Sequence, residues 1–473
     1  MDIKNTKENS KNTFVSAEFI RNLFSSTMSE MYKIEVPLYG DLLQLVESVN
    51  KAFLLNKPEL RNEFTKTGEI QRLDAERHGA IRLGKPSELF HMRRLFKVMG
   101  MFPVGYYDLA SAGVPVHSTA FRAIDNSALN KAPFRVFTSL LRLDLIDSLE
   151  LQQKVTAILE NRQIFTEKVL HLIDKFEKHG GLTKSDSEIF AQEAIETFRW
   201  HKNATVSIEV YNELLAQHRL VADVVAFKGP HINHLTPRTL DIDCVQVKMK
   251  LKHISCKENI EGPPARKCPI LLRQTSFKAL SENVIFKNSS KILKEGEHKA
   301  RFGEIEQRGI ALTQKGQDLY DKLLAETRIA FGGAPNADNV EEYNMILAEN
   351  FKSFPDDYAV MQRDKLAYFY YHITAKRKEK YSVKKYTKTD INKLLEVGLL
   401  HITPIIYEDF LPISAAGIFT SNLGNDEIKQ SYKETANQNL FEKYLGEPVI
   451  NLMKWYENKQ EESIEKCLLV LNS

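Results

Sequence analysis

Cysteine is scarce in this chain of 473 residues, which contains only four. So few do not form the disulfide framework of a small secreted protein, and we expect reduced thiols. An excess of one charge is also missing: 65 Lys and Arg residues face 62 Asp and Glu residues, a formal net charge of +3. Dedicated nucleic-acid-binding proteins carry a marked positive excess, so we expect no nucleic-acid partner.

Long hydrophobic runs are absent as well. No stretch approaches the roughly 20 apolar residues that a membrane span needs. The N-terminal sequence MDIKNTKENSKNTF lacks both the apolar core of a secretory signal and the Arg-rich, acid-poor character of a transit peptide. We therefore expect no membrane partner and a cytoplasmic location.

Several catalytic motifs are missing too. The sequence contains no Walker A motif, no Gly-x-Gly-x-x-Gly after a strand, no Gly-x-Ser-x-Gly, no His-Glu-x-x-His and no EF-hand loop. Nucleotide-binding, serine-hydrolase and zinc-protease functions are correspondingly disfavoured.

The hydrophobic patterning predicts helices around a strand-rich centre, which is an α+β fold. Helical periodicity is found at 16–32, 41–55, 86–98 and 313–330. Strand-like patterns are found at 78–83, 116–123, 221–229 and 302–308. We interpret 16–470 as a single catalytic domain, 139–220 as a helical insertion within it, and 1–15 as flexible.

The first candidate site is the segment ERHGAIRLG. If 78–83 is a strand, His78 and Arg82 point to the same face. Imidazole binds iron, zinc or copper, and guanidinium holds a carboxylate through two hydrogen bonds. Together they suggest a site for a metal-chelating organic acid; the alternative is a surface strand with a solvated arginine.

The second candidate is FKGPHINHLTPRTLDID, which follows the apolar run 221–229. Loops that leave a buried strand often carry function, and this one contains His231 and His234. Their spacing does not rank them as ligands. Asp241 and Asp243, on what we expect to be an extended segment, could orient a ligand histidine.

The third candidate is RFGEIEQRG, where Glu304 and Glu306 share one face of the expected strand. One carboxylate beside two histidines completes a facial triad, which leaves metal positions open for a 2-oxo acid and O₂. Alternation allows either glutamate. Two carboxylates on one face could also form a hydrolase acid/base pair, which would leave the histidines without a role.

At these segments the chain resembles the 2-oxoadipate dioxygenase/decarboxylase family, also called hydroxyglutarate synthase. The resemblance rests on six stretches in order along the chain: ERHGAIRLG, FPVGYYDL, GVPVHSTAFR, FKGPHINHLTPRTLDID, FGEIEQRGIALT and YEDFLPISAAGIF. Agreement across six separated motifs is far more specific than one triad. The resemblance implies a vicinal-oxygen-chelate-like fold, a cupped, incomplete β-barrel sheet around a metal with helices outside.

The resemblance also implies a site. The metal should be Fe(II), held by His78, His234 and, between the two glutamates, Glu304. His78 and Arg82 should contact the substrate, with Ile413 and Ser414 lining its pocket. No chemistry is assigned to His117, although HSTAFR is characteristic of the family.

The implied reaction converts 2-oxoadipate and O₂ to 2-hydroxyglutarate and CO₂, in lysine catabolism. The expected partners are therefore a small 2-oxo acid and O₂. One alternative is a zinc or other divalent-metal hydrolase or lyase using the same two histidines and glutamate. Another is an organic-acid-binding protein that keeps Arg82 without a functioning metal.

Overall fold

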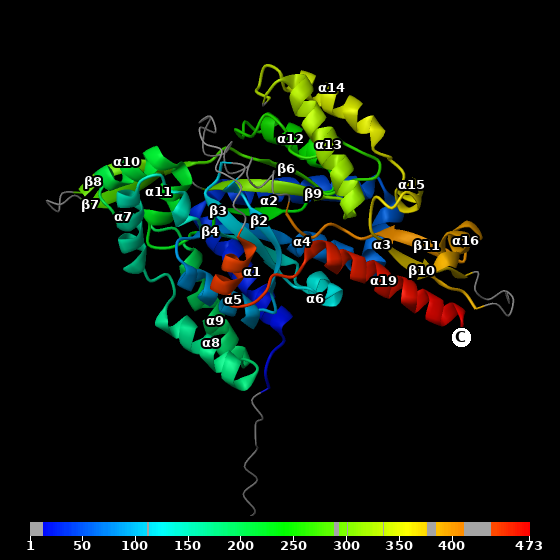
Figure 1. The fold of residues 1–473 in the computed structure, drawn as a ribbon, viewed down its shortest axis with the longest axis horizontal. Helices are drawn as coiled ribbons and strands as arrows, with labels where there is room; N and C mark the ends of the chain where they lie inside the picture. The colour runs from blue at the N-terminus through cyan, green and yellow to red at the C-terminus, as the bar shows by residue number, and fades with distance from the viewer. Residues whose placement is uncertain are drawn as a thin grey trace, which may run out of the picture.

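A mixed seven-stranded sheet organises the computed structural model (Figure 1). The structure describes residues 13–110, 113–287, 293–299, 301–333, 335–375, 385–410 and 437–473. In spatial order, the strands are β2 (Phe102–Asp108), β3 (Val116–Arg122), β4 (Phe134–Leu141), β1 (Arg77–Leu83), β5 (His234–Pro237), β9 (Phe302–Arg308) and β6 (Leu272–Ser276). The β1–β4 and β5–β9 pairs are parallel, and the other neighbours are antiparallel.

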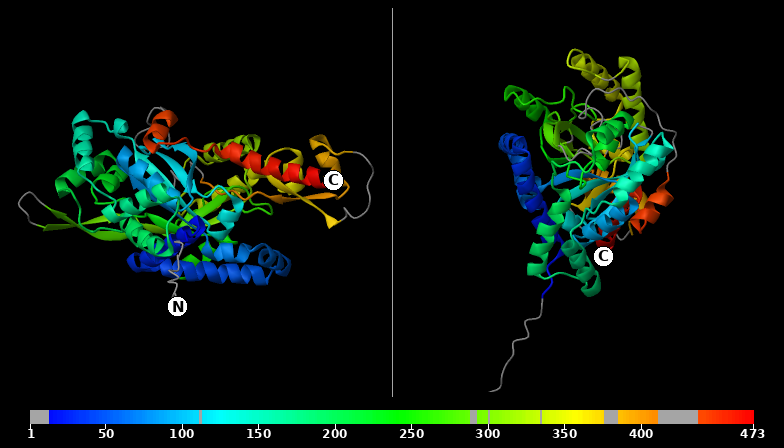
Figure 2. Two further views of the ribbon diagram at one scale, coloured as in Figure 1. Left: turned by 90° about the horizontal axis from the view of Figure 1, so that it is seen from below. Right: turned by 90° about the vertical axis from the view of Figure 1, so that its left-hand side faces the viewer.

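Two short strand pairs lie outside this sheet. They are β7 (Ser281–Lys287) with β8 (Leu293–Lys299) and β10 (Phe369–Ile373) with β11 (Leu400–Pro404). Figure 2 shows these pairs extending toward opposite ends of the molecule, so neither closes the main sheet.

Helices surround the sheet. The N-terminal and central ones are α1 (Ala17–Glu35), α2 (Pro37–Leu55), α3 (Pro58–Thr67), α4 (Glu69–Ala75), α5 (Pro86–Val98), α6 (Asn126–Lys131), α7 (Leu149–Glu160), α8 (Glu167–His179), α9 (Lys184–Ile195), α10 (Ile208–Gln217) and α11 (Arg219–Val225). The later ones are α12 (Ile242–Leu251), α13 (Gln314–Phe331), α14 (Val340–Asn350), α15 (Tyr358–Arg363), α16 (Ile391–Glu396), α18 (Gln438–Leu445) and α19 (Leu452–Leu471). The predicted α+β architecture, a curled sheet enclosed by helices, is confirmed.

The two faces of the sheet differ in character. Side chains alternate along a strand, so Ile81, Leu235 and Ile305 point to one face, which we call the outer face. They pack into a large apolar core with residues of α1, α2 and α5. Figure 2 shows α1 and α2, in blue, along one side of the molecule. The opposite, inner face carries buried polar and charged side chains, and the candidate site lies there.

Most of the predicted elements are confirmed. The helices expected at 16–32, 41–55, 86–98 and 313–330 correspond to α1, α2, α5 and α13. The strands expected at 78–83, 116–123 and 302–308 correspond to β1, β3 and β9. The helices bury one side of their surface, which gives them helical periodicity. The strands are buried almost throughout, and β1 and β9 alternate because one face is apolar and the other polar.

The predicted strand at 221–229 is wrong. Its first residues belong to α11, in which every residue from Leu220 to Val225 is buried. The side chain of His218 caps this helix by accepting a hydrogen bond from the amide of Leu220. A short apolar run that is buried all round has no periodicity, so its β-branched valines favoured the wrong element.

Two other expectations meet the structure only in part. Within 139–220 the chain is mostly helical, from α7 to α10, but β4 occupies the first residues of that range. Its description as an insertion, and the single catalytic domain at 16–470, remain predictions. The stretch 1–15 falls mostly outside the described residues. Among the helices that the structure describes, none is both long enough and apolar enough to cross a membrane.

Candidate metal centre

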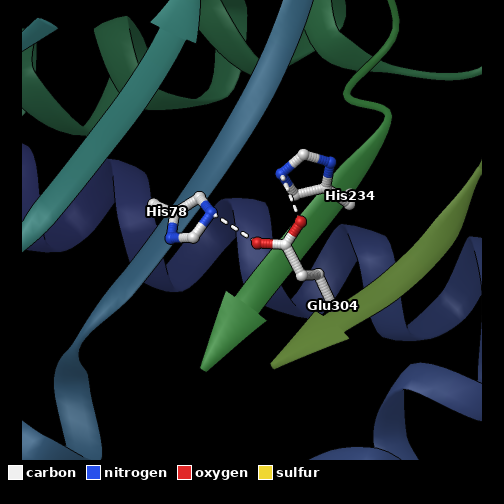
Figure 3. Close-up of side chains that lie close together, drawn as sticks. All are labelled: His78, His234 and Glu304. Atoms are coloured by element: carbon white, nitrogen blue, oxygen red, sulfur yellow. Dashed lines mark hydrogen bonds and ion pairs between the residues drawn. The ribbon is translucent and has the colours of Figure 1, made fainter. Parts of the chain in front are cut away.

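Three potential metal ligands converge on the inner face from three adjacent strands. His78 lies on β1, His234 on β5 and Glu304 on β9, and their side chains point toward one another (Figure 3). His78 Nε2 is 3.1 Å from Glu304 Oε1, and His234 Nε2 is 3.9 Å from Glu304 Oε2. One ligand atom from each residue lies within 4.8 Å of the others, and all three residues are buried.

The strand register explains this convergence. His78 lies opposite Thr236 across the antiparallel β1–β5 pair, while His234 lies beside Phe302 across the parallel β5–β9 pair. Neighbouring strands are about 4.8 Å apart, so side chains on one face of three strands can share a ligand.

Two glycines allow the strands and helices to approach closely around the ligands. A Cβ on Gly79 would lie 2.5 Å from Ile232 Cδ1 and 2.9 Å from the carbonyl oxygen of His234. A Cβ on Gly303 would lie 2.2 Å from the ring of Phe277. Gly79 follows one candidate ligand and Gly303 precedes another, so the absence of these side chains helps to set the spacing of the site.

Two neutral side chains hold the Glu304 carboxylate in place. Gln274 Nε2 donates to Glu304 Oε1 over 2.8 Å, and the Thr236 hydroxyl donates to the same oxygen over 3.3 Å. Both donors are buried. Oε2 is the oxygen nearer to His234, so the two oxygens have different neighbours.

The site favours an anionic glutamate. Burial alone would raise the pKa of Glu304, but His234 and His78 outweigh it and lower that pKa. Burial lowers the pKa of His234 to about 4, and Glu304 offsets only part of this effect. Burial also opposes protonation of His78, but Glu306 and Glu304 raise its pKa overall.

The donor set fits a divalent transition metal. Two imidazoles and one carboxylate form the combination that non-heme Fe(II) oxygenases use, with coordination positions left open. Among the described residues, neither His78 Nδ1 nor His234 Nδ1 makes a full hydrogen bond. The two differ in that the Glu306 carboxylate lies 3.2 Å from His78 Nδ1. The residues therefore suit a metal, and they hold the two imidazoles unequally.

Glu306 belongs to a group of buried ion pairs that we call the arginine–glutamate cluster. Its members are Arg72, Arg135, Arg238, Arg308, Glu76, Glu306 and Glu408, all buried. Arg135 is its centre, 2.6 Å from Glu76, 2.8 Å from Glu408 and 3.2 Å from Glu306. Burial opposes ionisation of Glu306, but Arg308 and His78 lower its pKa below the ordinary value.

Arg82 belongs to a second buried group, which we call the aspartate–histidine cluster. Its members are Arg82, Asp223, His231, His298 and Tyr211. Arg82 Nη1 donates to Asp223 Oδ2 over 2.6 Å. Asp223 Oδ1 lies 2.9 Å from His298 Nε2 and 3.3 Å from His231 Nε2. Burial raises the pKa of Asp223, but His231 and Arg82 hold it well below its ordinary value.

The chain is similar to known proteins over nearly its whole length. The family model for 2-oxoadipate dioxygenase/decarboxylase matches residues 24–422. A Pseudomonas putida protein of that name is 55% identical over 461 residues, which is 98% of each chain. The chain belongs to the 2-oxoadipate dioxygenase/decarboxylase family. The Escherichia coli member is 51% identical over 456 residues, which is 96% of this chain and 99% of the other.

A solved structure from the family is similar throughout. The crystal structure of the Pseudomonas putida hydroxyglutarate synthase in complex with 2-oxoadipate matches with a TM-score of 0.87 and 53% identity. The match covers 97% of this chain and 99% of that one. The similarity therefore extends over the sheet and the helices around it.

In this member of the 2-oxoadipate dioxygenase/decarboxylase family, some predicted site residues lie elsewhere. His231 lies in the aspartate–histidine cluster and packs edge-on against Trp200, with ring centroids 4.7 Å apart. Asp241 and Asp243 do not orient a histidine. Asp241 caps α12, and Asp243 pairs with Arg273 over 2.9 Å, because the expected extended segment is a helix.

Ile413 and Ser414, the predicted pocket residues, lie outside the described residues. His117 is buried on β3 against Tyr106 and Phe441. Burial, followed by Arg142, lowers its pKa to about 3.

Sequence reasoning missed three residues that hold the site of this family member. Thr236 and Gln274 bind Glu304, and Asp223 binds Arg82. Thr236 could have been found, since it alternates with His234 on β5. Gln274 needed the β6–β9 register, and Asp223 was hidden in the run interpreted as a strand.

Proposed function

We propose that this chain converts 2-oxoadipate and O₂ to 2-hydroxyglutarate and CO₂, as an Fe(II)-dependent enzyme. The observation that carries the proposal is the buried group of His78, His234 and Glu304, in a chain 53% identical to a hydroxyglutarate synthase solved with 2-oxoadipate. The cytoplasmic location and the place in lysine catabolism remain predictions.

We assign His78, His234 and Glu304 as the metal ligands. Bound Fe(II) would supply open coordination positions and the redox chemistry that a reaction with O₂ requires. The lowered pKa of His234 keeps its imidazole neutral, so a lone pair is available for a metal near neutral pH. Gln274 and Thr236 restrain Glu304, which limits the reorganisation needed on binding.

The surroundings of the ligands limit access of water. The ring of Phe410 lies edge-on to His78, with centroids 4.8 Å apart, and Phe137 packs against Phe410 at 5.1 Å. A site lined in this way suits a substrate whose middle is a short apolar chain and whose ends are polar.

We assign Arg82 to a substrate carboxylate. It lies on the same face of β1 as His78, four residues further along the strand, and it is buried. Asp223 fixes its Nη1, so the guanidinium has a defined orientation before a substrate arrives. Ile413 and Ser414 complete the proposed pocket on the basis of the family resemblance.

The test is O₂ uptake by protein loaded anaerobically with Fe(II), with 2-oxoadipate and 2-oxoglutarate offered separately. The proposal predicts uptake with 2-oxoadipate, accompanied by matching amounts of CO₂ and 2-hydroxyglutarate. Uptake with 2-oxoglutarate alone would contradict the assigned substrate. No uptake with either, in protein shown to hold iron, would contradict the reaction.

Two controls separate the alternatives. His234→Ala should hold no iron and consume no O₂, whereas His372→Ala, which alters an exposed histidine on β10, should behave as wild type. Zn(II)-loaded protein should be inactive. Conversion of 2-oxoadipate by the zinc form without O₂ consumption would favour a hydrolase or lyase instead.

A further inference from the structure

The imidazole of His78 lies between two carboxylates of the same strand. Glu304 Oε1 is 3.1 Å from its Nε2, and Glu306 Oε2 is 3.2 Å from its Nδ1. A neutral imidazole carries one proton, on one nitrogen or the other. Only if Nδ1 carries the proton does Nε2 present a lone pair toward Glu304 and His234.

Glu306 is not available as a metal ligand in its own right. Arg308 Nε donates to its Oε1 over 2.7 Å, and Arg308 Nη2 donates to its Oε2 over 2.9 Å. Arg135 Nη2 donates to Oε1 over 3.2 Å. Glu306 is fully buried and bound through both oxygens, so it forms a fixed acceptor facing His78 Nδ1.

His234 provides an internal contrast. Neither His78 Nδ1 nor His234 Nδ1 makes a full hydrogen bond among the described residues, but only His78 Nδ1 has a carboxylate nearby, that of Glu306 at 3.2 Å. The ring of His234 packs instead against Phe302, with centroids 4.9 Å apart. Packing, rather than a carboxylate, orients this second imidazole. Among the proposed ligands, Glu306 therefore makes its direct contact with His78.

We propose that Glu306 is a positioning residue of the metal centre, which holds His78 with its proton on Nδ1 and its Nε2 directed at the metal. Carboxylates that bind the second nitrogen of a ligand histidine fix its tautomer and ring orientation. This inference rests on the proposed function, because it takes His78, Glu304 and His234 as the ligands. It also gives the two glutamates of FGEIEQRG different tasks.

The competing explanation is that Glu306 only balances charge in the arginine–glutamate cluster. Glu408 is the matched control for that possibility. It is also buried and bound by two arginines, with Arg72 Nη2 2.6 Å and Arg135 Nη1 2.8 Å from its carboxylate. Among the described residues its carboxylate forms no hydrogen bond or ion pair with His78, so it shares the charge role without the proposed positioning role.

The experiment measures the affinity of the metal-free protein for Co(II), by competition with a chelator, and the absorption spectrum of bound Co(II). Glu306→Gln should weaken binding by about 10–100-fold and alter the spectrum, as expected for loss of an outer carboxylate. Glu408→Gln should leave both near wild type. Equal affinities and spectra in the two variants would overturn the inference.

Two further variants keep the result interpretable. Glu306→Asp retains the charge but withdraws the carboxylate from His78. It should therefore fold even if Glu306→Gln does not. Its affinity for Co(II) should be lower than that of the wild type. Wild-type affinity in Glu306→Asp would also overturn the inference. If Glu304→Ala binds Co(II) as tightly as the wild type does, the proposed ligand set is refuted, and the inference with it.

Discussion

Toward the start of β1, the arginine–glutamate cluster surrounds one flank of His78, and toward the end of β1 the aspartate–histidine cluster holds Arg82. The first contains four arginines and three glutamates, and Arg238 gains a further partner in Glu69 at its edge, 2.7 Å away. The second contains one arginine and one aspartate, and its remaining members are two histidines and a tyrosine.

This difference determines what each cluster can do. In the first cluster, removing one partner of an arginine–carboxylate pair leaves the other partner as an uncompensated buried charge among several charged side chains. That cluster is therefore suited to hold its side chains in fixed positions. In the second, the Asp223 carboxylate is shared by an arginine and two histidines. An incoming carboxylate can pair with Arg82 while the histidines continue to bind Asp223. The first cluster is therefore consistent with the positioning role proposed for Glu306, and the second with the substrate-binding role proposed for Arg82.

The largest effect should follow removal of the central arginine of the first cluster. Arg135→Met leaves Glu76, Glu306 and Glu408 short of a buried partner, so the free energy of unfolding should fall by about 3–5 kcal/mol. Denaturant unfolding of the metal-free protein measures it. Arg94→Ala, which breaks pairs with the exposed Asp174 and Glu177, is the control and should cost at most about 1 kcal/mol. Equal losses would mean that burial adds nothing to the first cluster.

The second prediction concerns substrate binding. Arg82→Met should weaken binding of 2-oxoadipate by about 2–5 kcal/mol, because a buried charged contact is lost, while iron is retained. The KM for 2-oxoadipate and the iron content of the same sample measure the two effects. An unchanged KM would remove Arg82 from the pocket and, with it, the functional contrast between the clusters.

Asp223→Asn tests the stability of the second cluster directly. The substitution keeps the shape of the side chain but removes the charge opposite Arg82, so it should cost about 1.5–3 kcal/mol of unfolding free energy. This is less than the loss expected for Arg135→Met, because Asp223→Asn deprives one arginine of its carboxylate, whereas Arg135→Met leaves three carboxylates short of a partner. A larger loss than that of Arg135→Met would reverse the comparison.

The smallest prediction uses a buried residue outside both clusters. The pKa of His117 is lowered to about 3 by burial, against about 6.5 in an unfolded chain. Between these values the unfolded state binds the extra proton, so stability falls as the pH decreases from 6.5. The loss should reach about 2 kcal/mol at pH 5.

His117→Gln should remove this part of the pH dependence. Unfolding curves of wild type and variant at pH 7 and pH 5 provide the measurement. The carboxylates of the first cluster do not contribute in this window, because their lowered pKa values place their effect below the ordinary value of 4.5. Parallel losses in wild type and variant would contradict the assignment of the effect to His117.

The sequence alone predicted the central elements because their patterns are simple. β1 and β9 alternate clearly, and this placed His78 beside Arg82 and Glu304 beside Glu306 on shared faces. Alternation could not separate the two glutamates, since both point inward. One feature that distinguishes Glu306 from Glu304 is its ion pair with Arg135. Arg135 lies on β4, and no local sequence pattern reveals that β4 pairs with β1.

The aspartate–histidine cluster was out of reach for a different reason. Asp223 lies in an apolar run that was interpreted as a strand, and His298 comes from β8, far along the chain. Their meeting depends on how α11 packs, which is decided by tertiary contacts. Strand alternation and the family resemblance both pointed to Arg82, but only the structure connects it to Asp223.

Gly79 and Gly303, beside the ligands, make the distances between the ligand atoms depend on how closely the surrounding backbone and side chains pack. Adding a methyl group at Gly79 would press on the backbone oxygen of His234, and adding one at Gly303 would press on Phe277 behind β9. Either change would move ligands without altering any donor atom. The distances between the donors could thus be adjusted by mutation from the outer face, with the chemical identity of the site left intact.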